Sequence, residues 1–148
     1  MASNVLYPSG SQHMLAGDIH LSTNQAGLLS ASYCALVKDT YTYSAAHEFY
    51  TGSNSFCPAA HAVVSASLTS VTITTGTLDA ANLVYSSVAA GSTITHIIIF
   101  QSGSAGVNDY LIAHYDTGSE GGVSIVTNGG DIAINWNANG MLSLSSSC

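Results

Sequence analysis

From Val63 onward the apolar residues recur with a period close to two, and this alternation constrains the fold more than any other feature of the chain. Successive side chains of a β-strand point to opposite faces, so a strand with one wet face alternates apolar and polar residues. The clearest example is 131–137, where Ile132, Ile134 and Trp136 occupy one face. Short strands separated by turn residues predict an all-β chain, folded as an antiparallel β-sandwich or a barrel-like domain.

Further strands are predicted at 32–38, 71–74, 93–100, 110–115 and 123–127. Segment 93–100 begins with alternation and ends in a fully apolar run, so we expect it to be a central strand. At 44–50 a serine precedes alanines and a glutamate, which permits one short helix and no more. No linker or internal repeat divides the chain, and 1–148 is expected to be a single β-rich domain.

The last two predicted strands allow an argument from parity. If Trp136 and Leu142 share the core face, the loop between their strands must hold an odd number of residues. We therefore expect a hairpin closed by 138–140, with Gly140 in the left-handed conformation. The predicted core consists of Leu36, Val71, Ile73, Ile97, Ile99, Ile132, Ile134, Trp136, Leu142 and Leu144.

The chain has one basic side chain, Lys38, and no arginine. Asp and Glu number 8 and bring the net charge to −7, so the field of the protein repels nucleic acid, which we exclude as a partner. Its 23 serines and 13 threonines make up about a quarter of the chain and supply much of its polar surface. A neutral, hydroxyl-rich sequence suits a passive surface or a protein–protein contact better than a reaction centre.

Motifs for catalysis or cofactor binding are missing from the sequence. The glycine-rich run 103–106 has no lysine after it, so it does not match a phosphate-binding loop. The 6 histidines lack the spacing of metal ligands, and burial with hydrogen bonds is the simpler interpretation for one or two of them. His114 and Asp116 could share a strand face, where structural pairing is the favoured interpretation. We expect no enzymatic activity and no metal or cofactor.

The cysteines form an odd set that cannot be fully paired within one chain. Cys34 lies in an apolar run and is expected to be a buried thiol. Cys57 and Cys148 lie in a loop and at the chain end, and a bridge between them in an oxidising medium stays open as an alternative. Apolar runs such as 97–100 are far shorter than the roughly 20 residues that span a bilayer. With no signal peptide at 1–4, we expect synthesis in the cytoplasm and no membrane partner.

Two parts of the chain resemble a known group of proteins. Residues 35–43 (ALVKDTYTY) and 46–49 (AHEF) resemble a recurrent ALVD…YT…HEFL block. Residues 97–100 (IIIF), 111–118 (LIAHYDTG) and 127–136 (TNGGDIAINW) resemble the YKDTG…LIAYIDT…TPNGGDITVTW close of the same proteins. These are small virion proteins of tailed bacteriophages, and the likeness extends over roughly residues 10–144.

The chain departs from that pattern at a few positions. His114 stands where the family usually has tyrosine, Val126 stands where it usually has proline, and the cysteines are not part of the pattern. The resemblance implies a virion component without saying which one.

Among virion components, a capsid decoration (cement) protein on the outside of an icosahedral head is the first expectation, since it needs a compact β core and no catalytic groups. Its partner would be the major capsid protein, and it would be located in the virion, which is assembled in the host cytoplasm. A trimer is the oligomer we favour. The alternatives are a neck or tail adaptor or fibre-attachment protein, and a glycan-binding β-sandwich that uses exposed Tyr and Trp platforms.

Aromatic residues near the middle of the chain are the candidate interface, because aromatic side chains are enriched in interface cores. With one basic residue available for ion pairs, self-association through them should be weakly sensitive to salt. The alternative is that these aromatic side chains close one side of the sandwich. The candidates are Tyr41, Tyr43, Phe49, Tyr50 and Phe56.

Overall fold

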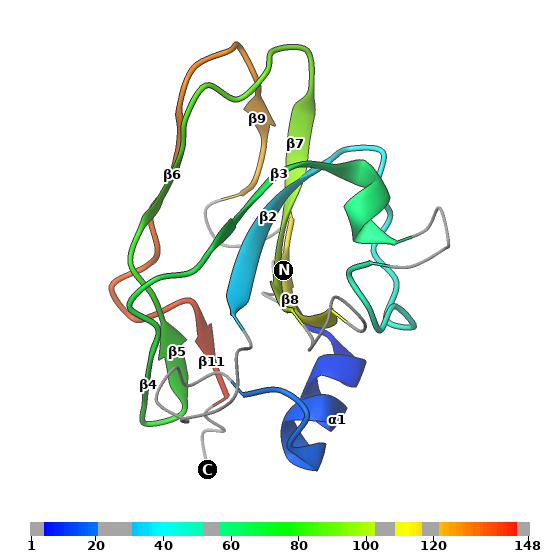
Figure 1. Cartoon of the computed structure of the whole chain (residues 1–148), viewed down its shortest axis with the longest axis vertical. Helices are drawn as coiled ribbons and strands as arrows, with labels where there is room; N and C mark the ends of the chain where they lie inside the picture. The colour runs from blue at the N-terminus through cyan, green and yellow to red at the C-terminus, as the bar shows by residue number, and fades with distance from the viewer. Residues whose placement is uncertain (1–4, 21–30, 52–56, 103–108, 117–121, 145–148) are drawn as a thin grey trace.

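The computed structural model describes residues 5–20, 31–51, 57–102, 109–116 and 122–144. Within these residues the strands are antiparallel, and they are joined by one α-helix and one 3-10 turn (Figure 1). The strands form a main sheet and two smaller sheets, packed as a sandwich-like fold. The main sheet does not close on itself. The predicted all-β class is confirmed in its sandwich form.

The main sheet has the strand order β1–β8–β7–β2–β3, and β9 also pairs with β7. One smaller sheet pairs β10 with β6, and the other has the order β11–β5–β4. The main-sheet strands are β1 (Val5–Leu6), β2 (Ser32–Lys38), β3 (Ala62–Ser67), β7 (Thr93–Gln101), β8 (Tyr110–Tyr115) and β9 (Ile125–Val126). The other strands are β4 (Thr72–Thr74), β5 (Thr77–Asp79), β6 (Leu83–Tyr85), β10 (Ile132–Ile134) and β11 (Leu142–Ser143).

β7 is the central strand, as its apolar run predicted. It pairs with β2 on one side and with β8 on the other. Ile97 and Ile99 face the smaller sheets, whereas Ile98 and Phe100 face the opposite side of the main sheet. The sequence stops alternating here because both faces of the strand are buried.

The larger core lies between the main sheet and the two smaller sheets, and tyrosine hydroxyls join the layers. The Tyr85 hydroxyl donates to the Cys34 carbonyl oxygen at 2.7 Å. The Tyr115 hydroxyl donates to the Met141 carbonyl oxygen at 2.6 Å. Each bond runs from one sheet to backbone of the other layer, so apolar packing and two buried hydrogen bonds hold the sandwich together.

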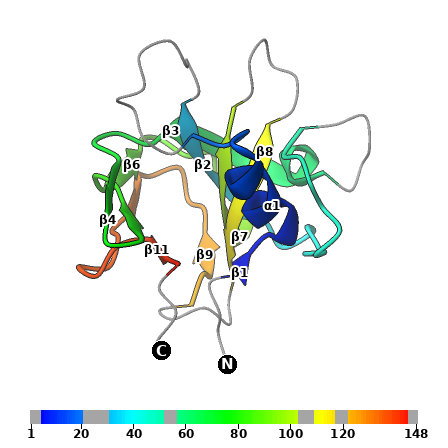
Figure 2. The same cartoon turned by 90° about the horizontal axis from the view of Figure 1, so that it is seen from below.

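The opposite face of the main sheet is covered by residues 39–51 and 57–61, which we call the cover (Figure 2). The cover is bonded to the sheet through its backbone. The Asp39 N–H donates to the Thr93 carbonyl oxygen at 3.1 Å, and the Tyr50 N–H donates to that of Asp109 at 2.7 Å. The cover ends in a 3-10 turn, η1 (Pro58–His61).

The α-helix lies at α1 (Pro8–Ala16), not at 44–50. Pro8 fixes the first helical φ, and Gly17 ends the helix at a φ of 82°. At the expected position a single turn forms, in which Ser44 accepts the N–H groups of His47 and Ala46 through its carbonyl and Oγ. The chain then extends, because its backbone pairs with the strand beside it: the Leu111 N–H donates to the Glu48 carbonyl oxygen at 3.1 Å.

The expected hairpin between 131–137 and 142–144 does not form. Gly140 has the predicted positive φ, at 93°, and its N–H closes a turn onto the Asn137 carbonyl oxygen at 2.9 Å. That turn interrupts the chain without reversing it. β10 pairs with β6 and β11 pairs with β5, so both strands run antiparallel to the same earlier segment, 77–85.

Six of the predicted core residues are buried: Leu36, Ile97, Ile99, Ile132, Ile134 and Leu142. Val71 and Trp136 are half-buried at the margin of the core. The prediction is wrong for Ile73, which is 49% exposed, and for Leu144, which is 54% exposed. Ile73 lies on β4, the outermost strand of its sheet, and Leu144 follows the last strand, so neighbours cover each of them on one side only.

Replacing Trp136 with alanine should lower the free energy of unfolding by about 1–2 kcal/mol, less than for a tryptophan at the centre of a core. The ring is half-buried, and its Nε1–H donates to the Ala81 carbonyl oxygen at 3.2 Å. Urea denaturation followed by circular dichroism measures the change. A loss above about 4 kcal/mol would place the ring inside the core instead of at its margin.

Candidate functional site

The five aromatic residues that the sequence proposed for an interface separate into three groups. Tyr41 is 3% exposed and Tyr50 is 6% exposed, so both lie within the fold against the main sheet. Tyr43 and Phe49 are partly exposed, and Phe56 lies outside the described residues. Tyr41 and Tyr50 therefore close one side of the sandwich, as the alternative had it, and offer little area to a partner. The interface stays a prediction for the others.

Tyr41 is the centre of a cluster of tyrosine and histidine side chains between the cover and the main sheet. Its hydroxyl lies 2.9 Å from the Tyr7 hydroxyl and 2.8 Å from Nδ1 of His47. Its ring centroid lies 5.3–6.2 Å from four histidine rings. We call this set the Tyr–His cluster: Tyr7, Tyr41, Tyr43, His47, His61, His96 and His114.

Two strands of the main sheet supply the histidine pair at the base of the cluster. His96 on β7 and His114 on β8 point to the cover side, and Nδ1 of His96 lies 2.9 Å from Nε2 of His114. Their rings stack at 5.1 Å, and the Tyr43 ring stacks on His114 at 4.7 Å. His114 is 1% exposed. A histidine–histidine hydrogen bond requires one nitrogen to donate and the other to accept, so the neutral pair shares one hydrogen between these two atoms.

Burial sets the protonation of the cluster. Burial, with the His96 ring as a second cause, lowers the pKa of His114 to about 4. Burial also lowers the pKa of His96, against the opposing effect of Asp116, and lowers the pKa of His47. Burial raises the pKa of Tyr41 to about 12. A lowered pKa favours the neutral imidazole at pH 7, so His47, His96 and His114 can take up protons in acid.

His13 on α1 has the opposite electrostatics. Its Nδ1 lies 2.9 Å from a carboxylate oxygen of Asp18, and its Nε2 lies 2.9 Å from one of Glu48. Burial acts to lower the pKa of His13, but the hydrogen bonds to the two carboxylates outweigh it and raise the pKa. A protonated His13 therefore joins the end of the helix to the cover.

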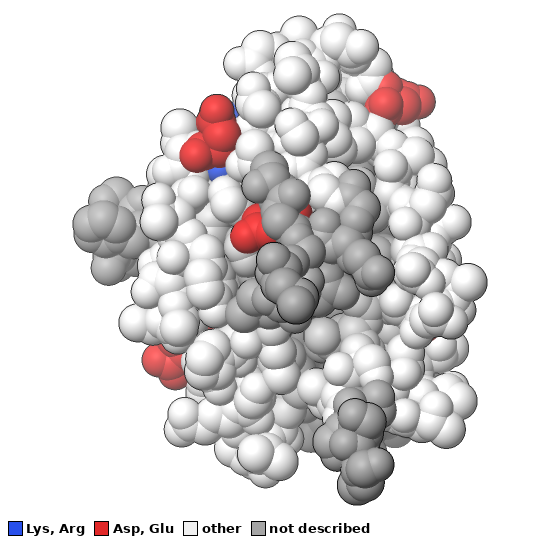
Figure 3. Space-filling view, turned by 180° about the vertical axis from the view of Figure 1, so that it is seen from behind, with Lys and Arg blue, Asp and Glu red and all other residues white. Residues whose placement is uncertain are grey.

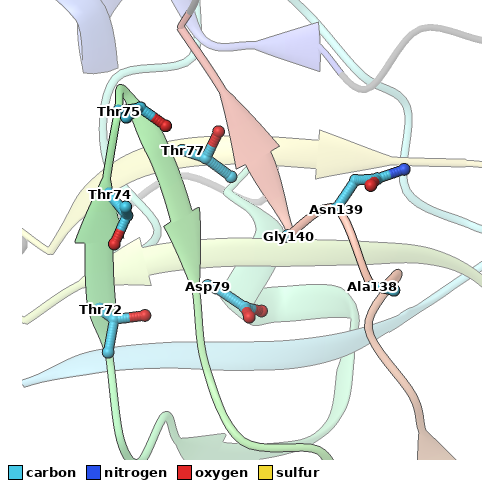
Figure 4. Close-up of a pocket in the computed structure, with 8 residues that line it drawn as sticks. All are labelled: Thr72, Thr74, Thr75, Thr77, Asp79, Ala138, Asn139 and Gly140. Carbon is cyan, nitrogen blue, oxygen red and sulfur yellow. The ribbon is translucent and has the colours of Figure 1, made fainter.

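A hydroxyl-rich groove of about 250 Å³ lies on the outer face of the β4–β5–β11 sheet (Figure 4). Thr74 and Thr77 flank it on the two strands of the hairpin, and Asn139 borders it from the turn. The side chains at alternate positions of β4 and β5 lie on this outer face: Thr72, Thr74, Thr77 and Asp79. The eight lining residues include no aromatic ring, which a sugar-binding platform would need: Thr72, Thr74, Thr75, Thr77, Asp79, Ala138, Asn139 and Gly140.

The cysteines that the sequence singled out are placed as follows. Cys34 is buried, as predicted, and Cys57 is a partly exposed free thiol. Cys148 lies outside the described residues. In the described part of the chain, no three side chains are grouped so that they would hold a metal ion. In that part, too, no helix has the length and apolarity to cross a membrane.

Sequence reasoning missed the Tyr–His cluster because its members come from five separate segments. A usable signal was present: His96 and His114 take inward positions of the strands with the strongest apolar character. A titratable side chain at such a position must find a hydrogen-bond partner inside the fold.

Comparison of the chain with protein-family models, curated proteins and solved structures finds no match.

Proposed function

We propose that this chain is a non-enzymatic structural protein of a tailed-bacteriophage virion that decorates the outside of the head by binding the major capsid protein. The resemblance of 35–49 and 97–136 to small virion proteins of such phages suggests the class. The surface of the folded chain supports the choice within the class. A decoration protein holds its shell through many copies of one modest interface, and it does so without touching the packaged DNA.

The observation that carries the proposal is an apolar and hydroxyl surface with few charges. Val84 on β6 is 62% exposed and Val126 on β9 is 73% exposed. The groove on the β4–β5–β11 sheet adds a row of threonine hydroxyls. Figure 3 shows that the carboxylates on one face of the molecule are scattered over a surface that is mostly uncharged. Such a surface associates by apolar contact and neutral hydrogen bonds.

The charge balance fits the outside of the shell better than its inside. A net charge of −7 with one lysine repels a polyanion at short range. With so few cations, ion pairs between copies are scarce, and a homo-oligomer, for which a trimer at threefold positions is our first choice, would rest on neutral contacts.

Copy number in purified virions tests the proposal most directly. Quantitative mass spectrometry should find this chain at on the order of hundreds of copies per particle, close to the number set by the icosahedral symmetry of the head. The major capsid protein serves as the internal standard. About a dozen copies or fewer would favour a neck or tail position with its lower symmetry. Absence from the virion would reject the proposal. Glycan binding by the isolated chain would favour the alternative of a glycan-binding β-sandwich.

Sedimentation of the isolated chain tests the assembly part of the proposal. We expect an oligomer, a trimer first, that persists between low salt and roughly 1 M salt, where ion pairs are screened within about 3 Å. A monomer at all concentrations, or an oligomer that salt dissociates, would contradict a surface that associates through neutral contacts.

A further inference from the structure

The cover is held on the main sheet by two kinds of contact. In the first kind, the Asp39 N–H donates to the Thr93 carbonyl oxygen, and near Glu48 and Tyr50 the cover is bonded through backbone to residues 109–111 and through a carboxylate to His13. In the second kind, between Tyr41 and His47, Tyr41 packs edge-on to His96 and Tyr43 stacks on His114. The His96 ring also has a hydrogen bond with the Tyr41 backbone. This second kind of contact depends on His96 and His114, whose hydrogen-bonded and stacked arrangement is that of the neutral pair.

Proton uptake by the histidine pair works against the closed arrangement. One added proton keeps the bond between His96 and His114 but places a cation among buried rings, which burial disfavours. A second proton leaves two N–H donors facing each other across 2.9 Å, with two positive charges and no acceptor between them. An open cover would let both rings reach water and accept protons freely.

We propose that the His96–His114 pair makes the cover an acid-sensitive latch, which lies closed on the main sheet at neutral pH and opens around residues 39–47 and 57–61 in acid. The inference does not depend on the virion assignment. It concerns a conformational device between β7, β8 and the cover. Opening would bare the aromatic and apolar face of the main sheet that the cover now buries, including Ile98 and Leu111.

The sign of the pH dependence follows from the pKa values. The ordinary pKa of histidine is about 6.5, and that of His114 in the closed state is about 4. Between these two pH values the open state binds more protons than the closed state does. The closed state is therefore favoured above about pH 6.5, and it becomes less favoured as the pH falls toward 4. The lowered pKa values of His96 and His47 act in the same direction.

The remaining titratable groups around the pair do not reverse this sign. The carboxylates of Asp116 and Asp39 raise the pKa of His96, but burial outweighs them. The other groups facing the pair come from the segment before α1, the cover and η1, and they are tyrosines and histidines: Tyr7, Tyr41, Tyr43, His47 and His61. None of these supplies a negative charge at neutral or acidic pH.

His13 limits how far the cover opens. Because its pKa is raised, the stability it contributes is fully present below the ordinary pKa of histidine and is lost as the pH rises through the raised value. Mild acid therefore keeps the bond between His13 and Glu48 while it loosens the histidine pair. The end of the cover near Glu48 stays attached, and the opening is local.

Amide hydrogen exchange of the full chain, read by mass spectrometry at about pH 7.5 and about pH 5 and corrected for the intrinsic rate, tests the latch. Peptides over 39–47 and 57–61 should lose protection by about tenfold or more at the lower pH, while peptides over β6 and β10 keep theirs. Equal protection of the cover at both values would overturn the proposal. Loss over β6 and β10 as well would do the same, since it would mean that the whole fold unfolds.

A double variant, His96→Phe with His114→Phe, removes both titrating rings and both partners of the hydrogen bond while keeping aromatic packing. Its cover should stay protected at both pH values, and acid opening in this variant would contradict the proposal. The control, His20→Gln, removes a histidine whose backbone, rather than its ring, holds the Gln101 side chain, and should open like the parent chain. If the double variant does not fold, ring resonances of the parent chain decide: protonation of both histidines with the cover still closed rejects the latch, and protonation together with opening supports it.

Discussion

Replacing Ile99 with alanine is expected to lower the free energy of unfolding by about 2–5 kcal/mol, the largest effect of any substitution considered for this chain. Ile99 is 1% exposed in the middle of β7. Its Cα pairs with Cys34 of β2 on one side and with Ala113 of β8 on the other, and its side chain faces the smaller sheets. The removed atoms leave a cavity that two flanking strands and a packed layer cannot close.

Urea denaturation measures this loss. The slope of the free energy of unfolding against urea concentration should be the same for the variant and the parent chain. The matched control is Val126→Ala, another β-branched residue in a strand paired with β7, but one that is exposed. The control should change stability by less than about 1 kcal/mol. Equal effects of the two substitutions would mean that the side of β7 that bears Ile99 is not buried.

Replacing Gly10 with alanine is expected to destabilise the protein by about 2–3 kcal/mol, although alanine is the better helix former by about 1 kcal/mol. Gly10 is the buried residue of α1, which packs on β8. A Cβ there would lie 2.5 Å from the Leu111 carbonyl oxygen and 3.2 Å from the Cα of Ile112. Both are backbone atoms of a paired strand, so no side-chain rotation relieves the contact, and the helix must shift.

Whether Gly10→Ala lowers or raises the stability of the protein tests this prediction. Thermal or urea unfolding should show a loss, and hydrogen exchange should show it concentrated in α1. Gln12→Ala is the control on the same helix, at an exposed position where the better helix former should be neutral or slightly stabilising. If Gly10→Ala were stabilising, the helix would not be docked on β8 through this residue.

Local pattern predicted seven of the described strands, because strand position depends on side-chain alternation that neighbours in sequence supply, but it did not single out β1, β3, β5 or β6. The segment 32–38 coincides with β2, and 110–115 coincides with β8. Gly140 has the predicted positive φ, although the hairpin from which it was predicted does not form. Pattern failed for the helix, because α1 lacks an amphipathic sequence and docks through a glycine. From the sequence alone, a segment with a glycine and no amphipathic pattern, such as 8–16, cannot be told from a turn. The helix is recognised only once β8, on which it packs, is in place.

The tyrosine and histidine side chains show the same limit. Tyr41 was predicted either as an interface residue or as one of the aromatic residues that close one side of the sandwich. It lies at the centre of the Tyr–His cluster because β7 and β8 present His96 and His114 beneath it. Residues that meet there are separated by up to about a hundred positions in sequence, and a period of two says nothing about such distances.

By itself, then, the sequence determined the class of the fold, the central strand and a surface poor in charge, since each depends on composition or on the spacing of near neighbours. The tertiary structure alone decided which strands pair and which polar groups become buried. The segment 131–144 illustrates why: its alternation suits a hairpin with itself as well as pairing with 77–85. The free energy of burying one shared core chooses between these pairings, and that energy belongs to the whole chain rather than to any window of it.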